Sequence, residues 1–315
     1  MAGAAPPAGG HRPLSVTVFD DGRRGHSRQW EGLTAALSER LPLTVTVVPA
    51  PRLHALPRAL AALRRQGPDL AVGAGHATHP VLAACRAFHR PRTIVLMKPS
   101  LPIRTFDLVI APAHDGLPAD ARMLTSEGPL CPFPVAPATR TPGSVLVLLG
   151  GPSPHFTFEE ARLVDRLDAL LSARARCEIT LADSRRTPAG LAARLATERP
   201  ALTLAAFETL PMTWLPRMLA TTEEVWVTPD SMSMIYEALT AGCRVGLLDL
   251  APTPPSRVVR AVADLVAAGR VATLGDEIVP AARAGEPFNE ARRIARQIVE
   301  IYLPRWGLTR GGHAG

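Results

Sequence analysis

Short apolar runs alternate with amphipathic stretches along most of this 315-residue chain. The first runs are Leu14–Phe19 and Leu43–Val48, and an amphipathic stretch at 29–41 lies between them. Short apolar strands separated by helices are typical of a parallel sheet that helices cover on both faces. The pattern therefore predicts an α/β fold.

A proline-rich segment, from Pro132 to Gly143, interrupts this alternation near the middle of the chain. Proline lacks a backbone N–H and continues neither a helix nor a central strand, so the segment indicates a domain boundary. The pattern then restarts at 145–149 and continues to a helical stretch at 257–268. We predict two doubly wound Rossmann-like domains that face a central cleft, 14–135 and 136–285, with a disordered tail at 1–13 and a helix at 286–306 that packs back on the first domain.

The formal net charge is +7, from 35 Lys and Arg against 28 Asp and Glu. Such a charge attracts phosphates, nucleic acid or an anionic membrane. Aromatic residues make up 4% of the chain and are not interleaved with a basic patch, so we expect no nucleic-acid partner. No apolar run approaches the roughly 18 residues of a membrane span, and the first residues lack the apolar core of a signal peptide. We expect a cytoplasmic protein, and peripheral contact with the anionic inner face of a membrane stays open.

The cysteines predict no metal site and no disulfide framework. Because they are far apart and form no C-x-x-C pair, we expect small buried residues at Cys85, Cys131, Cys177 and Cys243.

Polar residues follow several predicted strands of the first domain. Asp20-Asp21-Gly22 leads to Gly25-His26, another loop contains Gly75-His76, and a third contains Lys98, the only lysine of the chain. The carboxyl ends of parallel strands lie at one edge of a sheet, so His26, His76 and Lys98 are expected to converge there. A neutral imidazole at this edge could remove a proton from an acceptor hydroxyl. A tight turn, or a histidine with a structural role, explains each motif separately.

Three motifs of the second domain suit an anionic ligand. Glycines 150 and 151 follow a strand directly, and Arg185 and Arg186 precede a predicted helix, where guanidinium groups could bind phosphate oxygens. Asp230 or Ser231 could cap the next helix, on which Glu237 lies about two turns further on. Ordinary turns and a well-capped amphipathic helix are the structural alternatives.

Taken together, six motifs in this order resemble the elongated-mitochondria (mitochondrial fission) protein family, many bacterial members of which are described as glycosyltransferases. They are D-G-x-x-G-H, G-A-G-H-x-T-H, M-K-P-S, G-G-P-S-x-H, S-R-R-T-P and T-x-D-S-x-S-M-x-x-E-A-L, between Asp20 and about Leu248. The last motif also resembles the nucleotide-sugar site of glycosyltransferases with the GT-B fold.

The resemblance implies a donor site in the second domain and an acceptor site in the first. Residues of the last motif would hold the nucleotide sugar: Asp230, Ser231, Ser233, Met234 and Glu237. Its phosphates would lie among Gly150, Gly151, Ser153, Ser184, Arg185, Arg186 and Thr187. The acceptor would face the catalytic candidates His26, His76 and Lys98, together with Asp21, Gly22, Gly25, Gln29, Gly75 and Thr78.

These expectations lead to a glycosyltransferase that moves a sugar from a nucleoside diphosphate sugar to an envelope glycan or a lipid-linked acceptor. GT-B enzymes commonly need no bound metal, because helix dipoles and cations stabilise the departing diphosphate, and we expect neither metal nor cofactor here. Two alternatives remain. One is a non-catalytic adaptor with the same fold, as proposed for plant members of the family, and the other is a nucleotide-sugar epimerase.

Overall fold

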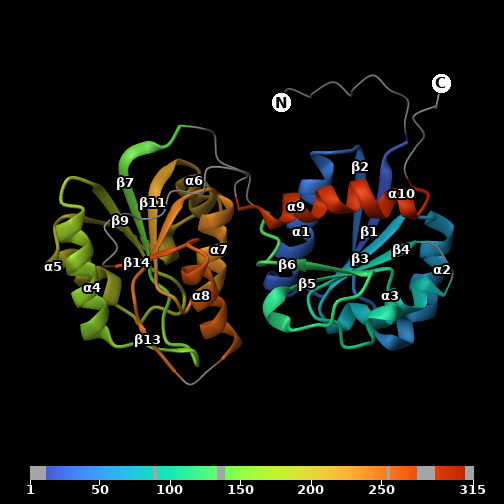
Figure 1. The fold of residues 1–315 in the computed structure, drawn as a ribbon, viewed down its shortest axis with the longest axis horizontal. Coiled ribbons are helices and arrows are strands. Elements are labelled where there is room, and N and C mark those ends of the chain that lie inside the picture. The colour runs from blue at the N-terminus through green and yellow to red at the C-terminus, as the bar shows by residue number, and fades with distance from the viewer. Residues whose placement is uncertain (1–11, 88–90, 133–138, 254–255, 275–287, 309–315) are drawn as a thin grey trace. The chain divides into compact units, whose positions relative to one another are not determined.

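The computed structural model describes residues 12–87, 91–132, 139–253, 256–274 and 288–308 (Figure 1). Most of the predicted tail at 1–13, the middle of the proline-rich segment and the first two residues of the predicted helix at 286–306 lie outside these ranges. The chain forms two compact units, of which unit 1 comprises Met1–Pro132 and Glu290–Gly315, and unit 2 comprises Phe133–Asn289.

Unit 1 is built on a parallel sheet of six strands in the order β2-β1-β3-β4-β5-β6. Alternate residues of a strand face opposite sides of a sheet, and both sides of β1 are covered. Val16 and Val18 pack in one apolar cluster, and Phe19 packs in another. The strands are β1 Leu14–Asp20, β2 Leu43–Pro49, β3 Leu70–Ala74, β4 Arg92–Leu96, β5 Leu108–Pro112 and β6 Met123–Ser126.

Helices cover both faces of this sheet. Leu33 of α1 and Ile294 of α9 join the cluster of Val16, whereas Leu63 of α2 and Leu82 of α3 join the cluster of Phe19. The helices are α1 Arg24–Ser38, α2 Leu56–Gln66, α3 His79–Arg86, α9 Glu290–Gln297 and α10 Leu303–Arg305, with a π-helical turn at Ile298–Tyr302 before α10.

The C-terminal segment is part of unit 1, and α9 lies beside α1 (Figure 1). The carboxylate of Glu290, which is 4% exposed, accepts hydrogen bonds from the backbone N–H of Glu127 at 2.7 Å and from Arg293 at 2.7 Å. Arg293 also donates to the carbonyl of Thr125, at the end of β6. Together with the buried Ile294, these bonds fix the segment to the edge of the sheet.

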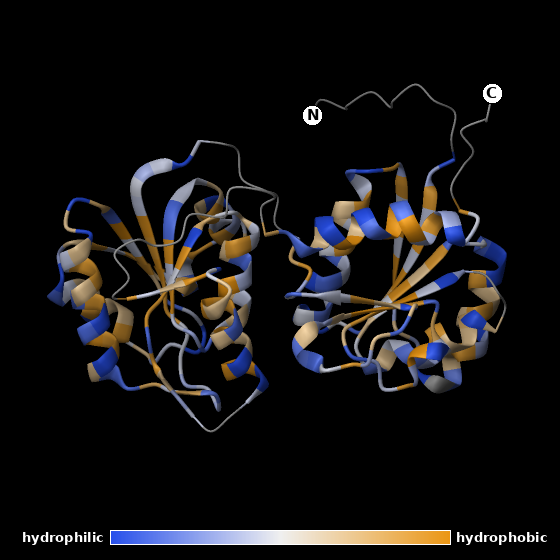
Figure 2. Ribbon diagram, viewed as in Figure 1, coloured by the Kyte–Doolittle hydropathy of each residue, from blue (hydrophilic) through white to orange (hydrophobic). Residues whose placement is uncertain are grey.

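Unit 2 is also built on a six-stranded parallel sheet, in the order β10-β9-β7-β11-β12-β14. In both units the central strands are hydrophobic, and hydrophilic residues lie on the exposed sides of the helices (Figure 2). The strands of the sheet are β7 Thr141–Leu148, β9 Glu178–Ala182, β10 Leu202–Ala205, β11 Thr222–Val227, β12 Arg244–Leu247 and β14 Ala272–Thr273.

The helices of unit 2 again have apolar faces that pack on the sheet. Leu163 of α4 and Leu195 of α5 pack in one cluster with Val145 and Val147. The helices are α4 Glu160–Ala173, α5 Leu191–Glu198, α6 Trp214–Thr221, α7 Met232–Thr240 and α8 Arg257–Ala267, and the short strands β8 Phe156–Thr157 and β13 Ala251–Pro252 form a separate antiparallel pair.

The predicted fold class, two doubly wound α/β units, is confirmed. The elements β6, β8, α6, β13 and β14 were not expected, and α1 begins at Arg24 rather than at Gln29. The earlier start places Gly25 and His26 in the first turn of a helix, not in a loop. All four cysteines are free, and three are buried, whereas Cys177 is only partly buried.

The strand orders show where a ligand is expected to bind each parallel sheet. Such ligands lie beyond the carboxyl ends of the strands, where the chain reverses its direction of winding. In unit 1 the reversal falls between β1 and β3, and in unit 2 it falls between β7 and β11. These two positions determine where a site is expected.

Candidate functional site

At the reversal point of unit 1, the loop after β1 is shaped by two carboxylates. Asp20 Oδ1 accepts hydrogen bonds from the N–H of Gly22 at 3.3 Å and from Ser27 Oγ at 2.9 Å. Asp21 Oδ1 accepts from the N–H of Arg23 at 3.1 Å. Because both carboxylates bind the turn that follows them, the chain enters α1 with its first residues held against the edge of the sheet.

The second oxygen of Asp21 pairs with a histidine. Asp21 Oδ2 lies 2.8 Å from Nδ1 of His26, and the side chains are 7% and 17% exposed. A carboxylate beside Nδ1 favours the tautomer that carries its proton there, which leaves Nε2 with a lone pair. An imidazole oriented in this way is suited to act as a general base.

Gly75, at the end of β3, makes room for this pair. Its φ is +86°, and a Cβ atom there would lie 2.3 Å from His26 Nδ1 and 2.9 Å from Asp21 Oδ2. Such distances are far below van der Waals contact, so a side chain at this position would displace the imidazole. The two strands that flank the reversal point thus build one arrangement, which includes His26 and Gly75.

The other two catalytic candidates lie at neighbouring strand ends and are exposed. His76 begins the 3₁₀ turn His76–Thr78, and its ring lies edge-on to that of His79, with centroids 5.5 Å apart. Lys98 follows Met97, which has a φ of +73°, and its Nζ lies 3.4 Å from the carbonyl oxygen of Asp115. Neither side chain joins the Asp21–His26 pair.

The remaining residues predicted for the acceptor side have mainly structural contacts. Thr78 is fully buried and donates to the carbonyl of Gly75 at 2.8 Å, and Gln29 Oε1 accepts from the N–H of Leu130 at 3.0 Å. Gly25 is exposed, and a Cβ atom there would have no other heavy atom within 4 Å. Gly22 instead lines a hollow of about 380 Å³, whose other walls are Asp20, Asp21, Val47, Pro49, Ala50 and Ala77.

A buried histidine that was not among the predicted site residues supports this edge. His79 Nδ1 lies 3.2 Å from the backbone N–H of Ser100 and 2.6 Å from Ser100 Oγ. Since the backbone N–H can only donate, Nδ1 is the acceptor and the proton is on Nε2. Burial, with a smaller contribution from His76, lowers the pKa of His79 to about 4. In the sequence, His79 could have been found only as part of a strand-end motif, and such a motif does not distinguish a buried histidine from an exposed one.

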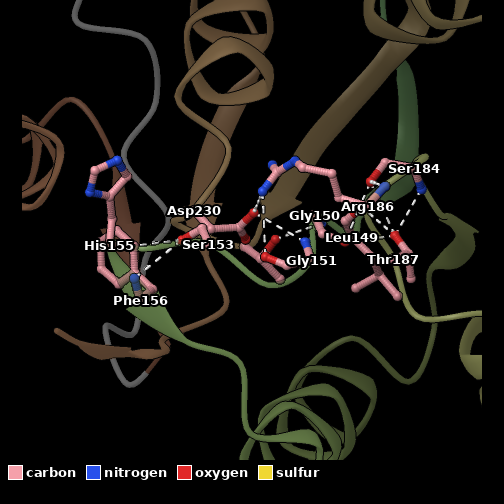
Figure 3. Close-up of polar contacts among 11 residues, drawn as sticks. Leu149, Gly150, Gly151, Ser153, His155, Phe156, Ser184, Arg186, Thr187 and Asp230 are labelled. Carbon is pink, nitrogen blue, oxygen red and sulfur yellow. Dashed lines mark hydrogen bonds and ion pairs between the residues drawn. The ribbon is translucent and has the colours of Figure 1, made fainter.

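At the reversal point of unit 2, the loop after β7 packs directly on the loop after β11 (Figure 3). The N–H of Gly150 donates to Thr228 Oγ1 at 2.7 Å, and the N–H of Gly151 donates to Asp230 Oδ2 at 3.1 Å. A Cβ atom on Gly150 would lie 2.2 Å from Asp230 Oδ2, and one on Gly151 would lie 1.9 Å from the carbonyl oxygen of Arg186. Both glycines are therefore required by close packing.

An ion pair crosses this loop. Arg186 Nη1 lies 2.7 Å from Asp230 Oδ2, and the Asp230 side chain is 1% exposed while that of Arg186 is 43% exposed (Figure 3). Within the described part of the chain, Asp230 Oδ1 is buried without a hydrogen-bond partner. A buried carboxylate is costly unless it is paired, so Arg186 neutralises a charge that the loop could not otherwise bury. Arg185, by contrast, is exposed.

Hydroxyl groups hold the arginine turn against the glycine loop. Thr187 Oγ1 donates to the carbonyl of Gly150 at 2.6 Å and accepts from the N–H of Ser184 at 2.8 Å (Figure 3). Ser153 Oγ accepts from the N–H groups of His155 and Phe156, each at 3.2 Å. The Thr187 hydroxyl thus ties the arginine turn to the glycine loop, and the Ser153 hydroxyl shapes the turn that follows that loop.

The predicted side-chain cap of α7 is not formed. Ser231 is at the N-cap position and is buried, but its side chain makes no capping bond, and Asp230 points to Gly151 and Arg186 instead. The first amides of a helix have no partner within the helix, and no side-chain cap engages those of α7. A helix N-terminus of this kind suits an anion. Ser233 is exposed and Met234 partly buried, whereas Glu237 is 3% exposed, so its predicted contact with a ribose stays a prediction.

Comparisons with known structures define the class of fold. The chain is similar to MurG from Acinetobacter baumannii, with a TM-score of 0.56 at 13% identity, over 92% of this chain and 100% of that one. It is also similar to a protein described as a UDP-N-acetylglucosamine 2-epimerase from Listeria monocytogenes, with a TM-score of 0.56 at 11% identity, over 95% and 98% of the chains. MnaA from S. aureus, solved with UDP, gives 0.51 at 12% identity over 95% and 98%. The fold is of the GT-B type.

Residues 24–302 match the family described as mitochondrial fission ELM1, and the chain belongs to that family. The resemblance seen in the motifs is thereby confirmed. No curated protein matched the sequence. Within the described ranges, no helix is long and apolar enough to cross a membrane, and no group of three or more His, Cys, Asp or Glu side chains could hold a metal ion.

Proposed function

We propose that this protein is a glycosyltransferase that moves a sugar from a nucleoside diphosphate sugar, bound by unit 2, to a hydroxyl of an envelope glycan or lipid-linked acceptor, bound by unit 1. The observation that carries the proposal is the Asp21–His26 pair at the reversal point of unit 1, held against Gly75. A group that removes a proton is what an acceptor hydroxyl needs in order to attack. We place this reaction in the cytoplasm.

In the proposed reaction, Nε2 of His26 takes the proton of the acceptor hydroxyl as its oxygen attacks the anomeric carbon of the donor. The bond between that carbon and the diphosphate oxygen breaks, and the diphosphate leaves with the electron pair. The imidazolium that forms is stabilised by Asp21, 2.8 Å from Nδ1. His26 is thus the proposed base, and His76 is the alternative at the same edge.

Unit 2 supplies three features that suit the leaving diphosphate. The glycine loop can bring backbone close to the ligand, α7 begins without a side-chain cap, and Arg185 adds a positive charge beside the Arg186–Asp230 pair. Preorganised donors and cations stabilise a charge that develops in the transition state. Asp230 would be a poor phosphate neighbour by itself, so its pairing with Arg186 is part of the same arrangement.

A nucleotide-sugar epimerase would use a similar donor site. One of the similar structures is described as a UDP-N-acetylglucosamine 2-epimerase, and another was solved with UDP. An epimerase would need no acceptor. An oriented base beside a separate hollow in unit 1 supports transfer to a second substrate.

A thermal-shift screen tests the proposal, with UDP-, GDP-, CMP- and dTDP-sugars as ligands, because a ligand that binds only the folded state raises the melting temperature. We expect a shift with one nucleotide class, and UDP is the first to try. Mass spectrometry of the products then distinguishes the two enzyme classes. We expect the sugar to be transferred or released, whereas an epimerase would convert it without an acceptor. A folded protein that responds to none of these donors would contradict the proposal and favour the adaptor.

A further inference from the structure

The positive charge of the protein belongs to one unit. Residues 1–132 and 290–315 contain 20 Lys and Arg against 11 Asp and Glu, a formal charge of +9. Residues 133–289 contain 15 against 17, a formal charge of −2. The unit that we assign to the donor, which is itself an anion, is therefore not the basic one. The excess in unit 1 requires another explanation.

Four exposed cations lie at the carboxyl edge of the unit 1 sheet. Arg23 and Arg24 follow β1, Arg52 follows β2, and Lys98 follows β4, and all four are exposed. The strand ends are tied into one rim, because Ala50 N–H donates to the carbonyl of Asp20 at 2.7 Å. Gly75 likewise lies against His26. The cations thus follow strands on both sides of the reversal point where the proposed base lies.

Within the described ranges, these four cations form one internal ion pair, between Arg24 and Glu31. Among the residues that the structure describes, the guanidinium groups of Arg23 and Arg52 form no hydrogen bond or ion pair. Arg24 has Glu31 only at 3.7 Å, and both groups are partly exposed. Burial, followed by the proximity of Arg24, lowers the pKa of Arg28.

The acidic residues of the rim, in contrast, already have partners. This includes Asp115 and Glu127, which follow β5 and β6. Asp20 binds the loop and Ser27, and Asp21 binds the loop and His26, as described above. Their charges weaken the local potential, but their oxygens already accept bonds. Beside them, the hollow of about 380 Å³ has an apolar wall of Val47, Pro49, Ala50 and Ala77. The rim therefore combines free arginines with a partly apolar hollow.

We propose that the acceptor bound by unit 1 is anionic, with a phosphate or carboxylate group that pairs with Arg23 and Arg24 while its hydroxyl faces His26. This inference rests on the proposed function and names the chemical class of its second substrate. Arginine suits such a group because its planar guanidinium binds phosphate or carboxylate oxygens in pairs. The surrounding positive potential raises the local concentration of the anion. A lipid headgroup and a soluble phosphorylated glycan both provide this chemistry.

The test measures binding of tripolyphosphate to the full-length protein by calorimetry at low salt. Arg23→Ala/Arg24→Ala removes two charges from the rim, and neither side chain caps α1. Arg64→Ala/Arg65→Ala is the matched control, because it removes two exposed charges in the last turn of α2, at the opposite edge of the sheet. We expect the rim variant to lose about tenfold in affinity and the control less than about twofold. Circular dichroism confirms that each variant is folded.

Tripolyphosphate could also bind unit 2, and Arg185→Ala identifies that case. An affinity lost in Arg185→Ala and kept in Arg23→Ala/Arg24→Ala would overturn the inference, and so would equal losses in the rim variant and its matched control. Sedimentation with phosphatidylcholine vesicles, with and without phosphatidylglycerol, distinguishes the sources. Rim-dependent binding to the anionic vesicles alone indicates a lipid headgroup, and rim-dependent binding to tripolyphosphate indicates a soluble phosphate. If neither depends on the rim, the inference fails, whereas binding of the donor to unit 2 is measured independently.

Discussion

The reversal points of the two sheets are built in the same way but end in different chemistry. In each unit, a glycine at the end of one strand lets the loop of its neighbour approach closely: Gly75 lies against His26, and Gly150 lies against Asp230. In unit 1 the result is a carboxylate paired with an imidazole, whereas in unit 2 it is a carboxylate paired with a guanidinium. The first pair offers a ring nitrogen that can accept a proton, and the second joins two oppositely charged groups.

This difference indicates a division of labour. An imidazole changes charge at physiological pH and suits the activation of a hydroxyl, while fixed cations beside a helix N-terminus suit a diphosphate. The proposed base belongs to the unit that carries the excess positive charge, and the proposed diphosphate loop belongs to the nearly neutral unit. Each of the following experiments breaks one side of this comparison and leaves the other intact.

The largest expected effect is on the proton transfer in unit 1. His26→Gln removes the base, and the release of nucleoside diphosphate from the donor should slow by about 10²- to 10⁴-fold, as is usual for general bases. His54→Gln is the control, because His54 is an exposed histidine in the same unit. A greater loss in His76→Gln than in His26→Gln would transfer the role of base to His76.

Gly75→Ala tests the approach of the two strands. The added Cβ would lie 2.3 Å from His26 Nδ1, so the imidazole must move, and we expect the turnover rate to fall about 10²-fold. Gly116→Ala is a matched control, because Gly116 also has a positive φ, of +62°, but nothing lies within 4 Å of its Cβ position. Urea unfolding measures the backbone cost that the two variants share. Equal turnover in both variants would show that the position of His26 does not matter.

Acid should weaken unit 1 through His79. Its pKa is about 4 in the folded protein against a usual value near 6.5, so the unfolded chain binds more protons between these values. The stability that neutral His79 contributes is fully present above about pH 6.5 and is lost as the pH falls towards 4. Between pH 7 and 5 we expect a loss of roughly 2 kcal/mol in the free energy of unfolding. His79→Gln should be less stable at pH 7 but should lose less on acidification, and an identical pH dependence in urea titrations would contradict this assignment.

Much of the fold follows from the sequence, because apolar runs and amphipathic periods are local patterns. The elements that were missed are short: β14 has two residues, β6 has four, and the eight-residue α6 contains Pro216, which is tolerated near a helix start but resembles a loop signal. Such segments are ordered by their neighbours rather than by their own periodicity.

The candidate sites were located from strand-end motifs, but the roles within them were less predictable. Asp230 was expected to cap α7 or to face the donor, and it pairs with Arg186, which lies 44 positions away in the chain. The burial of Thr78, His79 and Glu237 likewise depends on packing between elements. A single sequence shows which residues carry groups that could bind a ligand or transfer a proton. Tertiary contacts decide which of their oxygen and nitrogen atoms remain available.

The division of labour is tested most directly by calorimetric titration of UDP, or of the nucleotide that the screen selects, into wild-type protein and three variants. Arg185→Ala removes an exposed arginine beside the loop of unit 2, and Arg176→Ala removes one at the amino edge of the same sheet, just before β9. The account predicts about tenfold weaker binding for Arg185→Ala and less than about twofold change for Arg176→Ala and His26→Gln. If His26→Gln weakens nucleotide binding as much as Arg185→Ala does, the nucleotide is not confined to unit 2 and the division is wrong.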